Sequence, residues 1–278
     1  LSVIHMILKS SPEERRKIPG LSAERGDIIN AGALIVREIL TLTKAESLTI
    51  SGCGLREGLF YHWYDPIYDK NKELQHNMLL SSVRNYYSTL PLKDHDHTRY
   101  VTALALSMFD QWRKIYQMPD RMRTLLHMAG LLHDAGQVIN YYSHARHSAY
   151  MTANAHIFGW SHKEQVLCAL ITASHHGFSA QILTEKEIDR VKILSAFLAL
   201  AESLDENHEQ CISQVICTST PSSLNIHIYL NRDNFIVPAH ATKKIISAYE
   251  KLCHYPLTIQ WFPSSRQKDL IKEMARSL

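Results

Sequence analysis

The chain has 278 residues, of which 45% are hydrophobic and 21% are charged, and its formal net charge is +3. This is the composition of an ordinary globular protein with room for two or three modules. So small a positive charge gives no reason to expect nucleic acid binding. No apolar run approaches the roughly 20 residues that a membrane span needs, and we find no signal peptide. We therefore expect neither DNA nor a membrane as a partner.

The cysteines and histidines indicate the compartment and the kind of site. The five cysteines show no CxxC spacing, which favours reduced thiols in a cytoplasmic protein over a disulfide framework or a zinc site. The chain also has 17 histidines against 10 glycines. Histidine is the commonest transition-metal ligand, so the placement of these residues matters. The sequence begins in the middle of a helical pattern, and we expect it to be a fragment of a longer polypeptide.

The first 64 residues alternate predicted helices with one strand. We expect a buried helix over 1–8 and a second helix in which Ser11 is the N-cap, Pro12 the first residue and Glu14 the third. Ser22 should cap a long helix, and residues 47–51 should form a short strand. The long helix is expected to bury five apolar residues: Ile28, Leu34, Ile35, Ile39 and Leu42.

A glycine turn follows the predicted strand. Gly52, Cys53 and Gly54 lead into a helix from Leu55, and backbone N–H groups at such a turn can hold an anion. On spacing alone we favour a tight packing turn, because an isolated glycine pair is a weak signal. The polar residues 65–75 predict a linker.

From Asn77 the pattern is helical. A first stripe contains Leu79, Val83, Tyr86, Tyr87 and Leu90. Asp96 is expected to cap the next helix, which should run to about Tyr116 with this inward face: His97, Val101, Leu104, Ala105, Met108 and Trp112.

The stretch 125–136, LLHMAGLLHDAG, predicts a helix with Leu125, Leu126, Ala129 and Leu132 on one apolar face. It ends in His133 and Asp134, and Gly136 has the character of a C-cap. An imidazole and a carboxylate at the end of an apolar helix are costly to desolvate, so a compensating partner is expected.

Three more helices are expected before residue 208. Ser148 should cap a helix through Ile157, and a capping box should start at Ser161. The helix after Ser161 should end at His175-His176-Gly177, with these residues inward: Val166, Leu167, Leu170, Ile171 and Ser174. The last helix, about 185–206, carries Val191, Leu194, Leu198, Ala201 and Asp205 on one ladder.

The remaining residues predict a small α+β module. Residues 211–218, 224–230 and 257–262 have the pattern of strands, and 235–237 could add an edge. Helices are expected over 241–253 and 268–276. His227, His240 and His254 lack ligand spacing and are expected to be surface or packing residues.

His97, His133, Asp134 and Asp205 come from three helices, and each is predicted to face the interior of the bundle. Two imidazoles and two carboxylates suit a divalent metal such as Mn²⁺, Fe²⁺ or Zn²⁺. Such a metal would polarise a phosphoryl oxygen and acidify bound water. His147 and one of His175 or His176 are candidates for a second metal. For each residue alone a structural role competes: a lone inward histidine is usually a core residue, and Asp134 could simply fix the tautomer of His133.

The first segment resembles a known family. Glu13-Glu14-Arg15-Arg16, Ile18-Pro19-Gly20-Leu21, Arg25, Asp27-Ile28-Ile29, Ala31-Gly32 and Gly54-Leu55-Arg56-Glu57-Gly58 resemble, in order and separation, the Ppx/GppA family of exopolyphosphatases and guanosine pentaphosphate phosphohydrolases. Gly52-Cys53 departs from the larger polar or aromatic pair usual there. The matched part is the end of that family's catalytic module, which has an actin/hexokinase-like α/β fold. The family's N-terminal half, with its catalytic Glu and phosphate loops, has no counterpart in this sequence.

The second segment, 76–208, resembles the HD phosphohydrolase superfamily, whose pattern is H…HD…H…H…D. His97, His133, Asp134 and Asp205 match its ligand positions, and the run 144–148 resembles the HxxHS run of Ppx/GppA proteins. The resemblance implies a mainly α protein in three parts: 1–66 as the end of the phosphatase module, 76–208 as a helical HD domain, and 209–278 as a small α+β domain.

The two resemblances imply the following activity. The parent enzyme would release terminal phosphate from polyphosphate or guanosine pentaphosphate with Mg²⁺ or Mn²⁺, and the HD site would hold Zn²⁺ or Fe²⁺ as alternatives. This chain would supply polyphosphate binding and the contacts of a homodimer. Gly54, Arg56, Glu57 and Arg146 are the expected phosphate-binding residues, although Arg56 and Glu57 could equally form an internal salt bridge.

Two other functions remain open from the sequence. The helical domain could be an independently active, metal-dependent nucleotide phosphohydrolase. Alternatively, it could be a non-enzymatic module that senses polyphosphate or guanosine tetraphosphate. A metal between the four predicted ligands would favour the first alternative, and ligand binding without turnover would favour the second.

Overall fold

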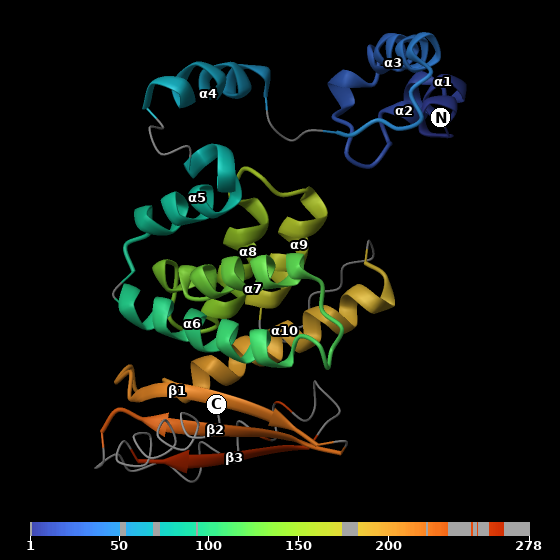
Figure 1. The fold of residues 1–278 in the computed structure, drawn as a ribbon. Coiled ribbons are helices and arrows are strands. Elements are labelled where there is room, and N and C mark those ends of the chain that lie inside the picture. Colours follow the sequence, from blue (N-terminus) through green and yellow to red (C-terminus); the bar gives the residue numbers. More distant parts are fainter. Residues whose placement is uncertain are drawn as a thin grey trace. The chain divides into compact units, whose positions relative to one another are not determined.

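The computed structural model describes residues 2–50, 54–68, 73–92, 94–173, 183–220, 222–232, 246, 249 and 256–263. It is mainly helical and has one three-stranded sheet (Figure 1). The contacts divide the chain into two units, Leu1–Gly54 and Leu55–Leu278. Within the described part of the chain, no helix has the length and apolar character needed to cross a membrane.

The first unit contains α1 (Ser2–Lys9), α2 (Pro12–Arg15), a 3-10 turn η1 (Ala23–Arg25) and α3 (Ile29–Thr43). The predicted start of α2 is confirmed. The Ser11 hydroxyl accepts the Glu14 N–H, and the Glu14 carboxylate accepts the Ser11 N–H. The long helix predicted after Ser22 is wrong in its start. Ser22 precedes η1 without a side-chain cap, and α3 begins only at Ile29.

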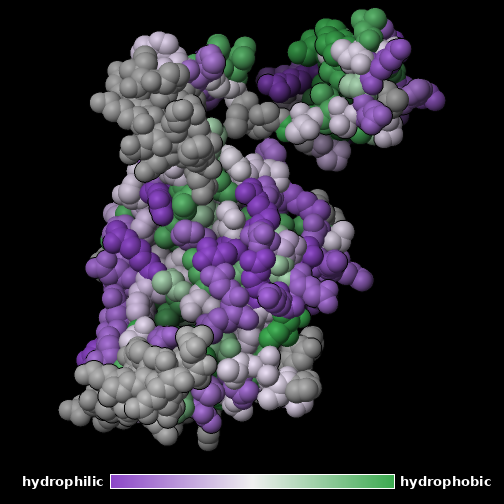
Figure 2. All heavy atoms as spheres, in the orientation of Figure 1, coloured by the Kyte–Doolittle hydropathy of each residue, from purple (hydrophilic) through white to green (hydrophobic). Residues whose placement is uncertain are grey.

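The burial predicted for this unit is also wrong. None of the described residues of α1 is buried, and in α3 only Ala33 is. The five apolar residues expected inside are 40–81% exposed, and apolar side chains are visible on the surface of this unit in Figure 2. The reason is that α1 packs on α3 while no described strand of the unit covers the outer face. The described part of the predicted strand, 47–50, likewise has no strand beside it and is irregular, and Ser51 lies outside the described residues.

The second unit begins with α4 (Leu55–Tyr68), the helix expected after the glycine turn. It runs further than predicted. α5 (Glu73–Thr89) then follows, so most of the expected linker over 65–75 is helical.

The helical bundle contains α5, α6 (His95–Trp112), α7 (Asp120–Leu132), α8 (His144–Asn154), α9 (His162–Thr172) and α10 (Glu185–Leu204). A 3-10 turn, η2 (Ala135–Val138), lies between α7 and α8 in the chain. The predicted capping box at Ser161 is confirmed. Two other predicted caps are wrong, by two residues for α6 and by five for α8. Asp94, not Asp96, caps α6 by accepting the His97 N–H at 2.8 Å, and Ser143, not Ser148, precedes α8.

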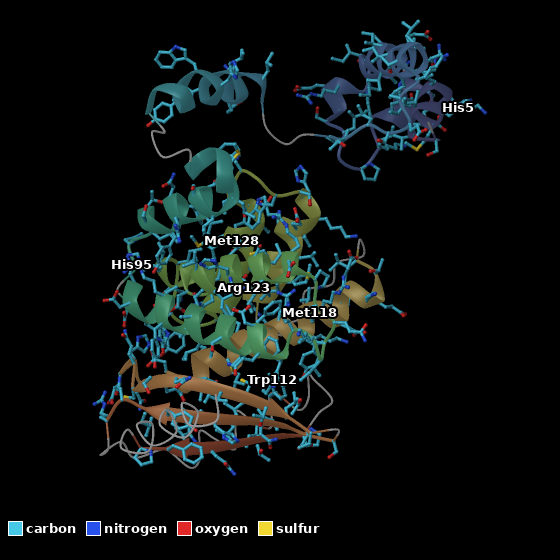
Figure 3. All side chains as sticks on the ribbon, in the orientation of Figure 1. His5, His95, Trp112, Met118, Arg123 and Met128 are labelled. Atoms are coloured by element: carbon cyan, nitrogen blue, oxygen red, sulfur yellow. The ribbon has the colours of Figure 1, made fainter. Side chains whose placement is uncertain are left out.

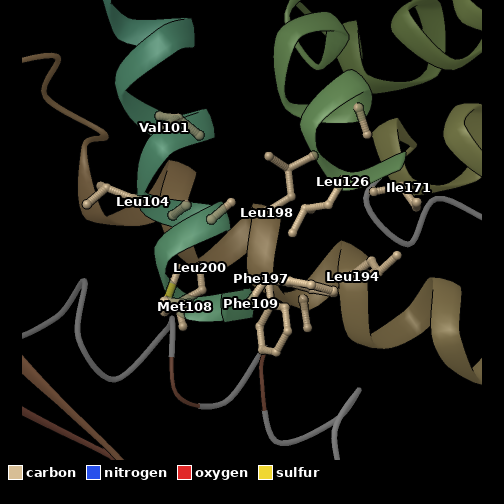
Figure 4. Packing of buried hydrophobic residues seen from close by; sticks show 14 of the residues in the cluster. Val101, Leu104, Met108, Phe109, Leu126, Ile171, Leu194, Phe197, Leu198 and Leu200 are labelled. Carbon is tan, nitrogen blue, oxygen red and sulfur yellow. The ribbon is translucent and has the colours of Figure 1, made fainter. Parts of the chain in front are cut away.

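The apolar faces predicted for the bundle form its core. All six inward residues of α6 and all four of α7 are buried, and Figure 4 shows α6, α7, α9 and α10 contributing side chains to one cluster. Leu167, Ile171, Leu194, Leu198 and Ala201 are buried as predicted, and Val166, Leu170 and Val191 are half-buried. Ser174 lies outside the described residues.

The sheet has the order β1 (Ile212–Ser219), β2 (Leu224–Leu230) and β3 (Leu257–Phe262). β1 and β2 are antiparallel, whereas β2 and β3 are parallel. β1 lies against α6. There the Tyr100 hydroxyl donates to the Ile212 carbonyl at 2.5 Å and accepts the Ile212 N–H at 2.7 Å. The predicted edge over 235–237 and the helix over 268–276 lie outside the described residues, as does 241–253 apart from Ile246 and Tyr249.

Candidate metal centre

The end of α7 is built so that His133 and Asp134 point into the bundle. α7 ends at Leu132, and the chain turns through η2, which packs against α8. The sequence predicted that Gly136 would cap α7, but the C-cap of this helix is His133. Gly136 instead allows α8 to approach, because a Cβ there would lie 2.2 Å from the His144 carbonyl oxygen and 2.4 Å from the Ser148 nitrogen.

Ser148 fixes this turn from inside α8. Its hydroxyl is fully buried, donates to the His133 carbonyl at 2.5 Å and accepts the Gly136 N–H at 2.8 Å. The backbone on both sides of Asp134 is therefore attached to α8. One serine thus holds the His-Asp pair against a neighbouring helix.

The structure brings His97, His133 and Asp134 together. All three side chains are buried, and one ligand atom from each lies within 4.8 Å of the others. His133 Nε2 lies 3.7 Å from Asp134 Oδ2, which is too long for a hydrogen bond. Ligands that share a tetrahedral cation with bonds of about 2.1 Å lie about 3.4 Å apart. The spacing is therefore close to that of metal ligands.

The Nδ1 atoms of three imidazoles each form a hydrogen bond with an oxygen atom. His97 Nδ1 lies 2.8 Å from Asp205 Oδ2, His133 Nδ1 lies 2.7 Å from the Gly130 carbonyl, and His144 Nδ1 lies 3.0 Å from the Tyr141 carbonyl. The two carbonyl oxygens can only accept, so His133 and His144 each carry a proton on Nδ1, and in the neutral tautomer of such a ring the lone pair is on Nε2. The same tautomer of His97 satisfies the Asp205 carboxylate. His133 Nε2 is buried without a hydrogen-bond partner in the described structure, and such an atom is prepared for a cation.

Asp205 meets His97 but does not join the three-residue group. It is the C-cap of α10 and is buried. Its Oδ1 accepts the Gln210 N–H at 2.7 Å, while Oδ2 bonds to His97. The geometry gives Asp205 the position of a residue that orients a metal-binding imidazole. His208 adds to this arrangement, since its ring stacks on His97 with centroids 3.7 Å apart and its Nδ1 bonds to Asp94.

A second group shares Asp134 with the first. Asp134, His144 and Glu202 also offer ligand atoms within 4.8 Å of one another. His144 Nε2 lies 3.6 Å from Asp134 Oδ1 and 3.8 Å from Glu202 Oε1. The two oxygens of Asp134 thus face different imidazoles, which is the arrangement of a carboxylate that can bridge two cations.

The surrounding carboxylates control the charge of this region. Burial would lower the pKa of the His97 imidazole, but the bond to Asp205 and the charges of Asp134 and Asp94 outweigh it, so the pKa is raised. The Glu202 carboxylate raises the pKa of His144. Burial would raise the pKa of Glu202, yet the adjacent His144 imidazole and the other nearby imidazoles lower it. The carboxylates around the two metal-ligand groups therefore favour a positive charge within each group.

The remaining predicted site residues lie elsewhere. His147 is half-buried on α8 beside Gly136 and belongs to neither group. His175 lies outside the described residues. Arg56 and Glu57 are exposed on α4, and Gly54 precedes that helix. Arg146 is exposed on α8, and no ion pair to it is recorded in the described part of the chain.

Sequence reasoning did not select His144, Glu202 or His208. His144 was visible in the run 144–148, but His147 was preferred. Glu202 lies three residues before Asp205 on α10, so helical periodicity places it on the same side and could have found it. His208 follows α10 in a left-handed turn, with φ +55°, for which the sequence offers no periodic signal.

Two family models match the chain in succession. Residues 1–66 match the model described as the Ppx/GppA phosphatase family, and residues 82–242 match the Ppx/GppA phosphatase, domain III. The second match alone covers more than half of the sequence, and it contains all the residues of both groups. The resemblance to the Ppx/GppA family, inferred from motifs of the first segment and from the run 144–148, is therefore confirmed. This chain belongs to the Ppx/GppA phosphatase family.

Proposed function

We propose that this chain works in a phosphatase that releases terminal phosphate from inorganic polyphosphate or guanosine pentaphosphate. The observation that carries the proposal is the order of the two family matches, with the end of the phosphatase segment followed by domain III. In this proposal residues 1–66 complete a catalytic module, 76–208 form an HD-type helical domain, and 209–278 form a small α+β domain. We place the protein in the cytoplasm and expect it to act as a homodimer.

The helical domain would hold a divalent metal at the group formed by His97, His133 and Asp134. The donor set of two imidazoles and one carboxylate suits Zn²⁺, Fe²⁺ or Mn²⁺ better than Mg²⁺, which prefers oxygen ligands. When bound, such an ion supplies Lewis acidity toward a phosphoryl oxygen. Asp205 and the Gly130 carbonyl would keep the two imidazoles oriented, and burial would limit access of bulk water.

Our sequence interpretation offered His147 and His175 as ligands of a second ion. We now propose His144 and Glu202 for that role, with Asp134 shared between the two sites, because their ligand atoms converge. Arg146 is exposed to solvent and stays our candidate for contact with a polyphosphate chain. Gly54, Arg56 and Glu57 also stay candidates for this contact.

The first experiment measures phosphate release by the purified chain. The family's catalytic Glu has no counterpart in this sequence, so we expect no release of phosphate from polyphosphate or guanosine pentaphosphate. A variant with His133→Ala serves as the control for contaminating phosphatases, since a contaminant would be unaffected by it. Turnover by the chain that disappears in His133→Ala would overturn this assignment of roles.

That same result would support the alternative function, an independently active metal-dependent nucleotide phosphohydrolase. The observation that favours it is the set of three imidazoles with Nδ1 anchored and Nε2 directed to the acidic groups. Elemental analysis after purification separates the cases. Bound metal without turnover fits the first proposal, and bound metal with nucleotide hydrolysis fits the alternative. Binding of polyphosphate or guanosine tetraphosphate with neither metal nor turnover would identify a sensing module.

A further inference from the structure

A pocket of about 530 Å³ lies between α5, α6 and α7, apart from both metal-ligand groups. Four of its lining residues carry basic groups: Arg84 on α5, His95 and Arg99 on α6, and His127 on α7. No carboxylate is among its lining residues. His95, labelled in Figure 3, is the first residue of α6. The pocket therefore combines a helix N-terminus with two guanidinium groups and two imidazoles.

The basic groups are available for a ligand. Arg84 is exposed, and no ion pair to it is recorded in the described residues. Arg99 bonds to Asp96 at 3.2 Å, but both side chains are more than half exposed, and an exposed pair of this kind is weak enough to exchange partners. His95 Nδ1 is buried without a hydrogen-bond partner in the described structure. A buried polar atom without a partner, in a pocket that two guanidinium groups also line, is free to hydrogen-bond to a polar ligand.

The position of His95 is fixed by Tyr87. The Tyr87 hydroxyl donates to the His95 carbonyl at 3.0 Å, and the two rings meet edge to face with centroids 4.8 Å apart. Burial and the charges of Arg84 and Arg123 lower the pKa of His127. The imidazole of His127 is thus neutral in its ordinary state, so it offers a hydrogen bond where the guanidinium groups offer charge.

The rest of the lining is mainly apolar. It includes Tyr87, Leu106 and Leu131, beside the hydroxyl-bearing Ser88 and Thr102. A fully inorganic anion would leave these walls in contact with water, whereas a ligand with a flat, weakly polar ring would cover them. The volume lies within the range of sites for small organic ligands. Charge at one part of the pocket and apolar surface at another therefore fit a phosphate ester that carries an aromatic ring.

The pocket is independent of the proposed metal centre. His95 and His97 are two residues apart on α6, so they point to different sides of that helix, and Leu131 and His133 are similarly separated around the end of α7. None of the ligand residues lines the pocket. Between the two sites α6 and α7 touch closely, since a Cβ on Gly130 would lie 2.7 Å from the Thr102 hydroxyl.

We propose that the pocket between α5, α6 and α7 binds a nucleoside monophosphate. The guanidinium groups of Arg84 and Arg99 hold the phosphate, His95 donates to it or to the sugar, and the base packs against Tyr87 and Leu131. This is a binding site in the helical domain that does not depend on metal, and no bond is made or broken in it.

Isothermal titration calorimetry of the full chain with guanosine monophosphate tests the proposal. The titration is done with EDTA present, so that the metal centre does not contribute and turnover plays no part. We expect saturable binding. Arg84→Gln should weaken it about tenfold, which is the usual effect of losing a hydrogen bond to a charged group. Ala103→Phe should abolish it, because Ala103 is exposed on the pocket wall and a larger side chain there fills the pocket without entering the core.

Arg113→Gln is the matched control. Arg113 follows the other end of α6, is paired with Asp120 and does not line the pocket. Its loss should leave the affinity unchanged, and circular dichroism should show that all three variants are folded. The proposal is overturned if guanosine monophosphate does not saturate the chain, or if Arg113→Gln weakens binding as much as Arg84→Gln. It is also overturned if inorganic triphosphate binds as tightly as the nucleotide, since the apolar walls would then play no role.

Discussion

Replacing Ser148 by alanine should loosen the turn that carries His133 and Asp134. The hydroxyl is fully buried and makes two hydrogen bonds, at 2.5 Å to the His133 carbonyl and at 2.8 Å from the Gly136 N–H. The variant leaves both backbone groups buried without that partner, at about 1–3 kcal/mol for each group. The greater helix propensity of alanine returns about 0.5 kcal/mol. We therefore expect the free energy of unfolding to fall by about 1.5–5.5 kcal/mol.

Ser195→Ala is the control for this prediction. Ser195 is also buried inside a helix, α10, but its hydroxyl makes one long bond, at 3.5 Å to the Ile171 carbonyl. The gain in helix propensity is the same in the two variants, so the difference between them isolates the hydrogen bonds. Urea unfolding followed by circular dichroism measures both. If Ser148→Ala loses no more stability than Ser195→Ala, the attachment of the turn to α8 is not energetically important and our reasoning is wrong.

Three further predictions concern the same domain. Gly136→Ala should prevent the close approach of η2 and α8, where the added Cβ would lie 2.2 Å from a carbonyl oxygen, and should lower the melting temperature far more than Gly32→Ala, where nothing lies within 4 Å. Asp205→Asn should weaken Zn²⁺ or Mn²⁺ binding by about 10–100-fold in a competition assay with a chelating dye, since it removes a charged partner of His97; unchanged affinity would exclude its orienting role. The Glu187 carboxylate, paired with Lys163 at 2.7 Å and bonded to Thr184, has its pKa lowered from 4.5 to about 2. A lowered folded-state pKa means that its stabilising effect is present above about pH 4.5 and is lost as the pH falls toward 2. A carboxyl ¹³C titration should show this pKa, and Lys163→Met should move it upward; a midpoint near 4.5 in the unmodified chain would contradict the pairing.

Much of the helical domain could be predicted from the sequence because periodicity and burial agree there. The inward faces of α6 and α7 were correct residue by residue, and they placed His97 and His133 inside. Strands β2 and β3 also kept the bounds predicted from their β-branched, alternating pattern. Where neighbouring elements cover one side of a helix or strand, the spacing of its apolar residues is enough to predict which side chains are buried.

The first unit shows where this reasoning fails. Ile35 and Leu42 have the spacing of a buried face, yet they are 60% and 81% exposed. Periodicity shows that a face is apolar and cannot show what covers it. The described part of the predicted strand, 47–50, is irregular for the same reason, since a strand needs a partner that its own sequence does not specify.

The candidate site was found only in part because two of its contacts depend on long-range packing. Asp205 was correctly expected near His97, but its position as the partner of Nδ1 depends on the Gln210 N–H, which lies in the turn after α10. His144 and Glu202 meet only because α8 and α10 bring them together. The motif predicts which residue types come together, but the packing of the helices and the turns between them determines which atoms are in contact.

The Tyr100 hydroxyl has a consequence for engineering this protein. One phenol oxygen satisfies both the N–H and the carbonyl of Ile212, so the first strand of the tail is fastened to the helix that carries His97. Deleting the C-terminal module, 209–278, would leave the Tyr100 hydroxyl without these two partners, one turn of α6 away from His97. It would also remove the Gln210 N–H that Asp205 accepts. Any shortened version meant to keep the imidazole cluster intact should therefore stop beyond the hairpin of β1 and β2, not at the end of α10.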